Sequence, residues 1–122
     1  MNTKRILLIE DEPLIQRSLK KLLEKRGAEV TIASNGKAAL DLILSTSFDR
    51  IICDLMLQDI SGFDVIEDAK KKYSLSEISK IFIIITAYSS PQVLDKAQNY
   101  GCTVLSKPFT DIEQALETFM NF

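Results

Sequence analysis

Five short apolar runs recur along the chain, and segments with a different, helical pattern lie between them. The runs are residues 5–9, 29–33, 50–53, 81–85 and 103–105. The first, third and fourth runs are apolar almost throughout, which is typical of strands covered on both faces of a parallel sheet. We therefore predict a strand at each of the five runs.

The intervening segments repeat apolar side chains at the spacing of an amphipathic helix. The predicted helices cover residues 13–26, 36–45, 62–72 and 91–100, and a fifth helix opens at residues 110–113. Their apolar positions are interpreted as core: Ile15, Leu19, Leu22, Leu23, Ala39, Leu40, Ile43, Leu44, Phe63, Ile66, Ala69, Ile112, Ala115, Leu116 and Phe119.

Capping residues support several of these helix boundaries. Pro13 suits the first position of a helix, and Asn35 can cap the second helix. Residues 89–91, Ser-Ser-Pro, give the fourth helix a cap followed by proline. Thr110 and Glu113 have the spacing of a capping box at the start of the last helix.

The alternation of strand and helix indicates an α/β fold, with a doubly wound, five-stranded parallel sheet flanked by five helices. The sequence contains no linker, internal repeat or low-complexity segment, so we expect residues 1–122 to form one domain. In such sheets, functional groups gather beyond the carboxyl ends of the strands. The residues at those ends are therefore the candidates for function.

The composition removes several classes of function. The net charge of -2 gives no electrostatic reason to expect a nucleic acid or a membrane as a partner. The chain has no histidine, which excludes a Ser-His-Asp triad, a Cys-His pair and the usual zinc sites. Cys53 and Cys102 match no metal spacing and are interpreted as buried thiols in a reducing compartment. The first apolar run is too short for a signal peptide or a membrane span, so we expect a cytoplasmic protein.

Polar side chains follow four of the five predicted strands. Glu10 and Asp11 follow the first strand, and Asp54 closes the third. Thr86 follows the fourth strand, and Lys107 lies just beyond the fifth. An acid at the end of a buried strand is costly unless it is paired or holds a metal. Each of the other groups alone has an ordinary explanation in a helix start or a turn, but their convergence on one edge favours a functional site.

Three carboxylates at one edge repel one another and need a counter-charge. Oxygen ligands without histidine or cysteine fit Mg²⁺. The Lys107 ammonium group and the Thr86 hydroxyl add donors that suit a phosphoryl group. Asp54 can then act as a nucleophile and form an acyl phosphate. The strand ends thus predict a site for phosphoryl transfer.

Four stretches of the sequence resemble the receiver domains of bacterial response regulators. They are LLIEDE at 7–12, IICDLML at 51–57 with SGFDV at 61–65, IIITAYS at 83–89 and LSKPF at 105–109. They occur in the family's order and spacing over essentially the whole chain. The resemblance implies the flavodoxin-like strand order 2-1-3-4-5 and a role as a phosphorylation switch in a two-component phosphorelay.

The resemblance also implies a role for each strand-end residue. Asp54 is the expected phosphoacceptor. The residues expected to bind Mg²⁺ are Glu10 (through water), Asp11, Asp54 and, by its backbone carbonyl, Met56. The groups expected to contact the phosphoryl group are the Thr86 hydroxyl, the Ala87 backbone N–H and Lys107, which is followed by a cis bond to Pro108.

The partners are implied in the same way. The phosphoryl donor would be a phosphohistidine on a histidine kinase or phosphotransfer protein. The signal would then pass to an output domain or protein that the sequence does not identify. The last helix lacks the basic residues often found in dimerising receivers, so we expect a monomer or a weak dimer.

Three positions depart from the usual pattern of the family. Gln58 stands where proline is usual, Ser61 where aspartate is usual, and Val104 where an aromatic residue is often found. In many members that aromatic side chain swings inward when the threonine moves toward the phosphoryl group. Val104 cannot report phosphorylation in this way.

Two other functions stay open at the level of sequence. One is a degenerate receiver that is not phosphorylated and serves as a docking module. The other is an aspartate-nucleophile phosphatase, which commonly needs a second acid where this chain has Met56. We expect a switch that catalyses only its own phosphorylation and dephosphorylation, and not a turnover enzyme.

Overall fold

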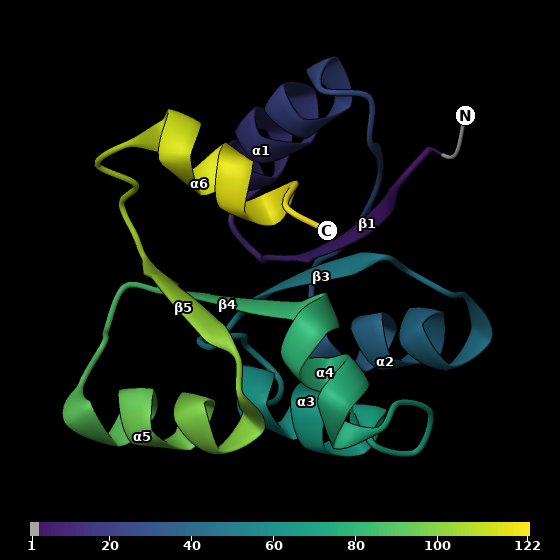
Figure 1. The fold of residues 1–122 in the computed structure, drawn as a ribbon, viewed down its shortest axis with the longest axis vertical. Coiled ribbons are helices and arrows are strands. Elements are labelled where there is room, and N and C mark those ends of the chain that lie inside the picture. The colour runs from purple at the N-terminus through teal and green to yellow at the C-terminus, as the bar shows by residue number, and fades with distance from the viewer. Residues whose placement is uncertain (1–2) are drawn as a thin grey trace.

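Five parallel strands form one sheet at the centre of the molecule, in the order β2-β1-β3-β4-β5 (Figure 1). The computed structural model describes residues 3–122. The strands are β1 (Arg5–Ile9), β2 (Glu29–Ala33), β3 (Arg50–Asp54), β4 (Phe82–Thr86) and β5 (Thr103–Ser106). The predicted fold class, strand order and five strands are confirmed. The last three strands each extend one residue further at their carboxyl ends than predicted.

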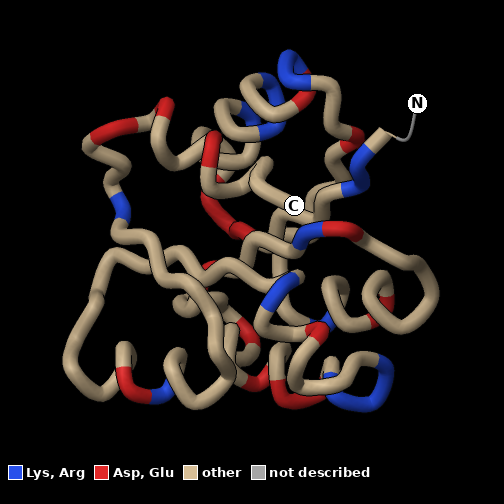
Figure 2. Tube along the Cα trace, in the orientation of Figure 1, with Lys and Arg blue, Asp and Glu red and all other residues tan. Residues whose placement is uncertain are grey.

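Two helical layers cover the sheet. Figure 1 shows α1 and α6 on one face, and α2, α3, α4 and α5 on the other. The helices are α1 (Pro13–Lys25), α2 (Gly36–Ser45), α3 (Gly62–Ala69), α4 (Leu75–Ile81), α5 (Pro91–Tyr100) and α6 (Ile112–Phe119). Among residues 3–122, no helix is long and apolar enough to cross a membrane. Figure 2 shows acidic and basic segments spread over both layers, as a small net charge allows.

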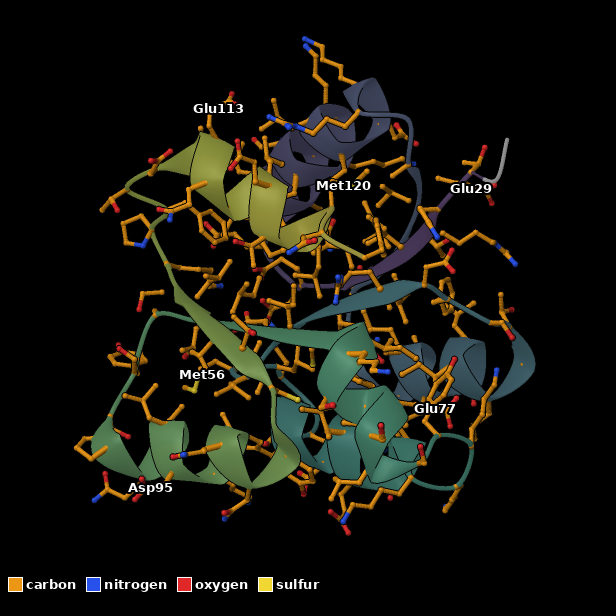
Figure 3. All side chains as sticks on the ribbon, in the orientation of Figure 1. Glu29, Met56, Glu77, Asp95, Glu113 and Met120 are labelled. Atoms are coloured by element: carbon orange, nitrogen blue, oxygen red, sulfur yellow. The ribbon has the colours of Figure 1, made fainter. Side chains whose placement is uncertain are left out.

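Helix α4 was not predicted, and the single helix expected over residues 62–72 is wrong beyond Ala69. The chain turns after Ala69, and a capping box formed by Ser74 and Glu77 starts a new helix. Glu77 marks this helix start in Figure 3. The helix was missed because it has only seven residues and buries one side chain, Ile78. Its last residue, Ile81, is apolar and was assigned to the following strand.

Capping side chains set most of the other helix starts. Asn35 accepts a hydrogen bond from the Ala38 N–H at 2.8 Å, and Ser90 caps α5 ahead of its first-turn proline. The predicted capping box at the last helix is wrong. Asp111, and not Thr110, is the N-cap of α6, because its carboxylate accepts the Gln114 N–H at 3.0 Å.

The core consists of two apolar layers, one on each face of the sheet. Most predicted core positions are buried or half-buried, but Leu44 and Ile112 are 49% and 36% exposed. Leu44 lies in the last turn of α2, where it points away from the buried Ile43, and Ile112 is the first residue of α6. Cys53 and Cys102 are free, buried thiols, as predicted.

Arg50, at the amino end of β3, is buried against the ends of two helices. Its guanidinium donates hydrogen bonds to the carbonyl oxygens of Lys80, Phe119 and Asn121. Lys80 lies in the last turn of α4 and Phe119 ends α6, so one side chain satisfies carbonyls that helix ends leave free. Burial lowers the pKa of Arg50. These contacts fix the amino end of β3 against α4 and α6.

Candidate functional site

Three carboxylates meet at the carboxyl ends of β1 and β3. The strands are neighbours, and the register pairs Ile9 with Cys53, so the residues that follow, Glu10 and Asp54, lie side by side. One oxygen from each of Glu10, Asp11 and Asp54 lies within 4.8 Å of the other two. Glu10 is fully buried, Asp54 is 2% exposed and Asp11 is half-buried. The structure therefore brings together the three acids that the sequence placed at this edge.

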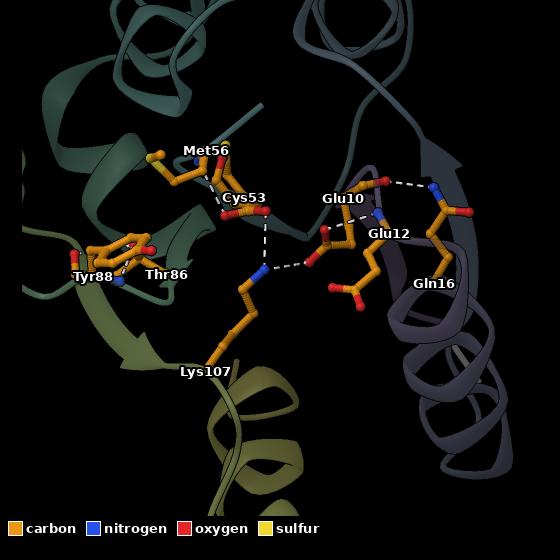
Figure 4. Close-up of polar contacts among 9 residues, drawn as sticks. Glu10, Glu12, Gln16, Cys53, Met56, Thr86, Tyr88 and Lys107 are labelled. Carbon is orange, nitrogen blue, oxygen red and sulfur yellow. Dashed lines mark hydrogen bonds and ion pairs between the residues drawn. The ribbon is translucent and has the colours of Figure 1, made fainter. Parts of the chain in front are cut away.

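Lys107 reaches this cluster from the segment after β5. Its Nζ atom lies 2.9 Å from Glu10 Oε1 and 3.1 Å from Asp54 Oδ2 (Figure 4). The backbone N–H of Lys107 donates to the Thr86 carbonyl at 2.8 Å, and the following bond to Pro108 is cis. In the structure, the ammonium group is shared with Glu10.

The electrostatics of the cluster follow from burial. The pKa of Glu10 is raised to about 7: burial is the largest cause, the hydrogen bond from Lys107 acts in the opposite direction, and the nearby Asp54 charge adds to the increase. Burial alone would lower the pKa of Lys107, but its hydrogen bonds to Glu10 and Asp54 outweigh burial and raise it. The site thus holds more negative charge than one ammonium group offsets.

Thr86 ends β4 next to β3, and only 1% of it is exposed. Its Oγ1 accepts a hydrogen bond from the Tyr88 N–H at 3.1 Å and lies 3.2 Å from the Tyr88 carbonyl oxygen. Ala87, between them, is exposed. The hydroxyl therefore bonds to the backbone of its own loop. The sequence did not predict this orientation of the Thr86 side chain.

Met56 and Tyr88 lie on the side of Lys107 away from Glu10 (Figure 4). The backbone N–H of Met56 donates to Asp54 Oδ1 at 3.2 Å. Both side chains are largely exposed, 60% for Met56 and 68% for Tyr88.

Gly62 lets helix α3 start close against the carboxyl end of β3. A side chain at this position would meet the Asp54 carbonyl oxygen and the Leu55 Cα atom at less than 3 Å. Ser61, where the family usually has aspartate, forms a capping box with Asp64 at the start of the same helix. The departure at Ser61 therefore keeps a functional N-cap.

Comparison with known families decides what kind of domain this is. Residues 6–118 match the response regulator receiver domain. The chain belongs to this family. Solved structures similar to this receiver domain include the receiver domain of the Francisella response regulator 1452, with a TM-score of 0.82 and 26% identity over 96% of this chain and 93% of that one. A CheY-like receiver protein from Methanospirillum hungatei gives a TM-score of 0.79 and 28% identity, with 98% of each chain covered.

Curated relatives carry receiver domains within longer proteins. The response regulator ArlR of Staphylococcus epidermidis is 36% identical over 112 residues, which cover 91% of this chain and 48% of that protein. The transcriptional regulatory protein CrdR of Helicobacter pylori is 31% identical, over 97% of this chain and 55% of that protein. The receiver domain described here thus spans about half the length of these relatives.

Proposed function

We propose that this receiver domain is a phosphorylation switch, in which Asp54 accepts a phosphoryl group from a phosphohistidine on a histidine kinase or phosphotransfer protein. The observation that carries the proposal is the position of the Asp54 carboxylate. It is buried at a strand end, 3.1 Å from the Lys107 ammonium group and beside two further acids. A similar response regulator from Burkholderia pseudomallei, 28% identical with a TM-score of 0.80, is described with a phosphorylated aspartic acid and a calcium ion.

The residues present fit a divalent cation. Glu10, Asp11 and Asp54 offer only oxygen ligands, their atoms are close enough to share one ion, and their negative charge exceeds that of Lys107. We assign Mg²⁺ to Asp11, Asp54 and the Met56 carbonyl, with Glu10 acting through water. When bound, Mg²⁺ would offset the charge of the acids and of the incoming phosphoryl oxygens.

The chain's own groups account for the transfer itself. A bond forms between a carboxylate oxygen of Asp54 and phosphorus as the phosphorus–nitrogen bond of the phosphohistidine breaks. The bonding electrons stay with the imidazole nitrogen, which takes up a proton. Lys107 then pairs with a phosphoryl oxygen, while the Thr86 hydroxyl and the Ala87 N–H donate to the others.

We also propose that the domain acts as a monomer or weak dimer in the cytoplasm and passes its signal to an output domain or protein. Buried, free thiols at Cys53 and Cys102 agree with a reducing compartment. The domain catalyses only its own phosphorylation and dephosphorylation. Val104, within β5, packs half-buried against the core in place of the aromatic that other receivers use, so the signal leaves the site by a different contact.

Phosphorylation by acetyl phosphate tests the proposal. Intact-mass measurement after incubation with acetyl phosphate and Mg²⁺ should show a gain of one phosphoryl group, and Asp54→Asn should abolish it. Asp95→Asn is the matched control, since Asp95 lies on the outer side of α5 (Figure 3) and should leave the gain unchanged. A chelator should block the reaction. If the parent gains no mass, the domain is a docking module. If Asp54→Asn gains as much as the parent, the acceptor is another residue.

A further inference from the structure

The loop that joins β3 to α3, residues 55–61, is attached to the start of helix α2. Asp59 lies in this loop, and its Oδ1 accepts the Gly36 N–H while its Oδ2 accepts the Lys37 N–H, both at 2.9 Å. These two N–H groups belong to the first turn of α2, which has no intrahelical partner for them. The hydrogen bonds from Gly36 and Lys37 lower the pKa of Asp59 to about 2. A carboxylate from outside the helix therefore caps it.

A second contact joins the same two segments. Ile60 packs against the core layer that includes α2, and a side chain at Gly36 would overlap the Ile60 side chain. The absence of a side chain at Gly36 thus lets the loop lie directly on the helix start. The ends of the loop are held separately, by the Leu55 N–H on the Ile85 carbonyl at 3.2 Å and the Gly62 N–H on the Leu55 carbonyl at 3.0 Å.

The loop also carries Met56, three residues before Asp59. In the proposed function, the backbone carbonyl of Met56 is a ligand of the cation. Asp59 is exposed at the far side of the loop and bonds to α2, so any effect that it has on the cation is transmitted by the loop backbone.

We infer that Asp59 is a positioning residue for the cation: by fixing the 55–61 loop on α2, it holds the Met56 carbonyl in place before the cation arrives. This inference rests on the proposed function. Ordering a loop residue costs conformational entropy, so a loop that is already fixed gives tighter binding than one ordered by the ion. Groups that orient metal ligands without touching the metal are known to act in this way.

Helix α2 offers a matched control. Asn35 caps the same helix turn through the Ala38 N–H but lies outside the loop. Asn35→Ala therefore removes a cap from α2 and leaves the loop attached, whereas Asp59→Ala removes a cap and frees the loop. Both variants should lose stability to urea. Asp59→Asn keeps an acceptor oxygen for the helix N–H groups and should restore most of the lost affinity for Mg²⁺.

The test is titration of each folded protein with Mg²⁺ by isothermal calorimetry. Asp59→Ala should raise the Kd for Mg²⁺ about tenfold, while Asn35→Ala should stay within about twofold of the parent. Gly36→Ala, which pushes Ile60 off the helix, should also raise the Kd and serves if Asp59→Ala does not fold.

Three outcomes would overturn the inference. In the first, the loop variants bind Mg²⁺ as tightly as the parent. In the second, Asn35→Ala weakens binding as much as they do, which would reduce Asp59 to a helix cap. In the third, the parent itself does not bind Mg²⁺. Only that third outcome also removes the cation from the proposed function, so the two failures are distinguishable.

Discussion

The ammonium group of Lys107 bridges two buried acids, Glu10 at 2.9 Å and Asp54 at 3.1 Å. It is therefore the internal counter-charge of the acid cluster. Any cation that binds the same carboxylates must do so next to a positive charge. The bound cation and the ammonium group would then compete for Glu10 and Asp54. In the proposed function, a phosphoryl group supplies new oxygens to which Lys107 can bind.

Lys107→Met should therefore strengthen the binding of Mg²⁺ by about fivefold, because repulsion between the ammonium group and a nearby divalent ion exceeds about 1 kcal/mol. Without Mg²⁺, the same variant should lose about 3 kcal/mol of stability, since it leaves buried carboxylates unpaired. Calorimetry and urea unfolding measure the two effects. Lys25→Met, at the exposed end of α1, is the control. Weaker binding of Mg²⁺ by Lys107→Met would contradict the competition.

Met56→Asn should speed the loss of the phosphoryl group about tenfold, equal to about 1.4 kcal/mol of barrier. Hydrolysis needs a water molecule in line with phosphorus, and Met56 offers it no strong hydrogen bond. An asparagine side chain would orient that water. The measurement is the decay of phosphoprotein after the donor is removed, with Mg²⁺ present. A fast decay of the parent that Met56→Asn leaves unchanged would show that this side chain does not gate the water.

Arg50→Lys should destabilise the fold by about 3 kcal/mol, even though the charge is kept. A lysine carries its three N–H donors on a single nitrogen, which cannot reach the three carbonyls that three separate guanidinium nitrogens contact, so the ends of α4 and α6 would keep unpaired oxygens. Urea unfolding gives the free energy. Arg17→Lys, on the exposed face of α1, should change it little. If both variants lost the same free energy of unfolding, the three hydrogen bonds of Arg50 would make no specific contribution to stability.

Acid should reduce the stabilising effect of Asp59. The pKa of this carboxyl group is about 2 in the folded protein and 3.8 ordinarily, so the ionised form is favoured by folding. Its contribution is complete above the unfolded value and is lost as the pH falls toward about 2. The stability difference between the parent and Asp59→Asn should therefore narrow from pH 5 to about pH 2. A constant difference across that range would contradict the assignment.

The strands and the convergence of their ends could be predicted because both depend on local pattern and topology. Runs of apolar residues identify buried strands, and parallel strands bring their carboxyl ends to one edge. Asp54 and Thr86 were placed by that reasoning alone. The start of helix α4 could also have been predicted, since Ser74 and Glu77 have the spacing of a capping box.

The remaining features depend on contacts between distant parts of the chain. Lys107 and Glu10 are 97 residues apart, and their pairing depends on side-chain conformations that no local pattern encodes. The role of Arg50 has no local signal in the sequence, because the carbonyls that it binds belong to helix ends far along the chain. The role of Asp59 likewise depends on distant partners, the N–H groups of Gly36 and Lys37.

The hydrogen bonds between Thr86 and the backbone of Tyr88 give the protein an optical reporter of its own state. The chain has no tryptophan and three tyrosines, of which Tyr73 is buried and Tyr100 is hydrogen-bonded to Glu67. Tyr88 is the exposed one, two residues from the hydroxyl that would turn toward a phosphoryl group. The intensity of its ultraviolet emission should change whenever Thr86 exchanges partners, so fluorescence of the unlabelled protein should report that exchange in real time.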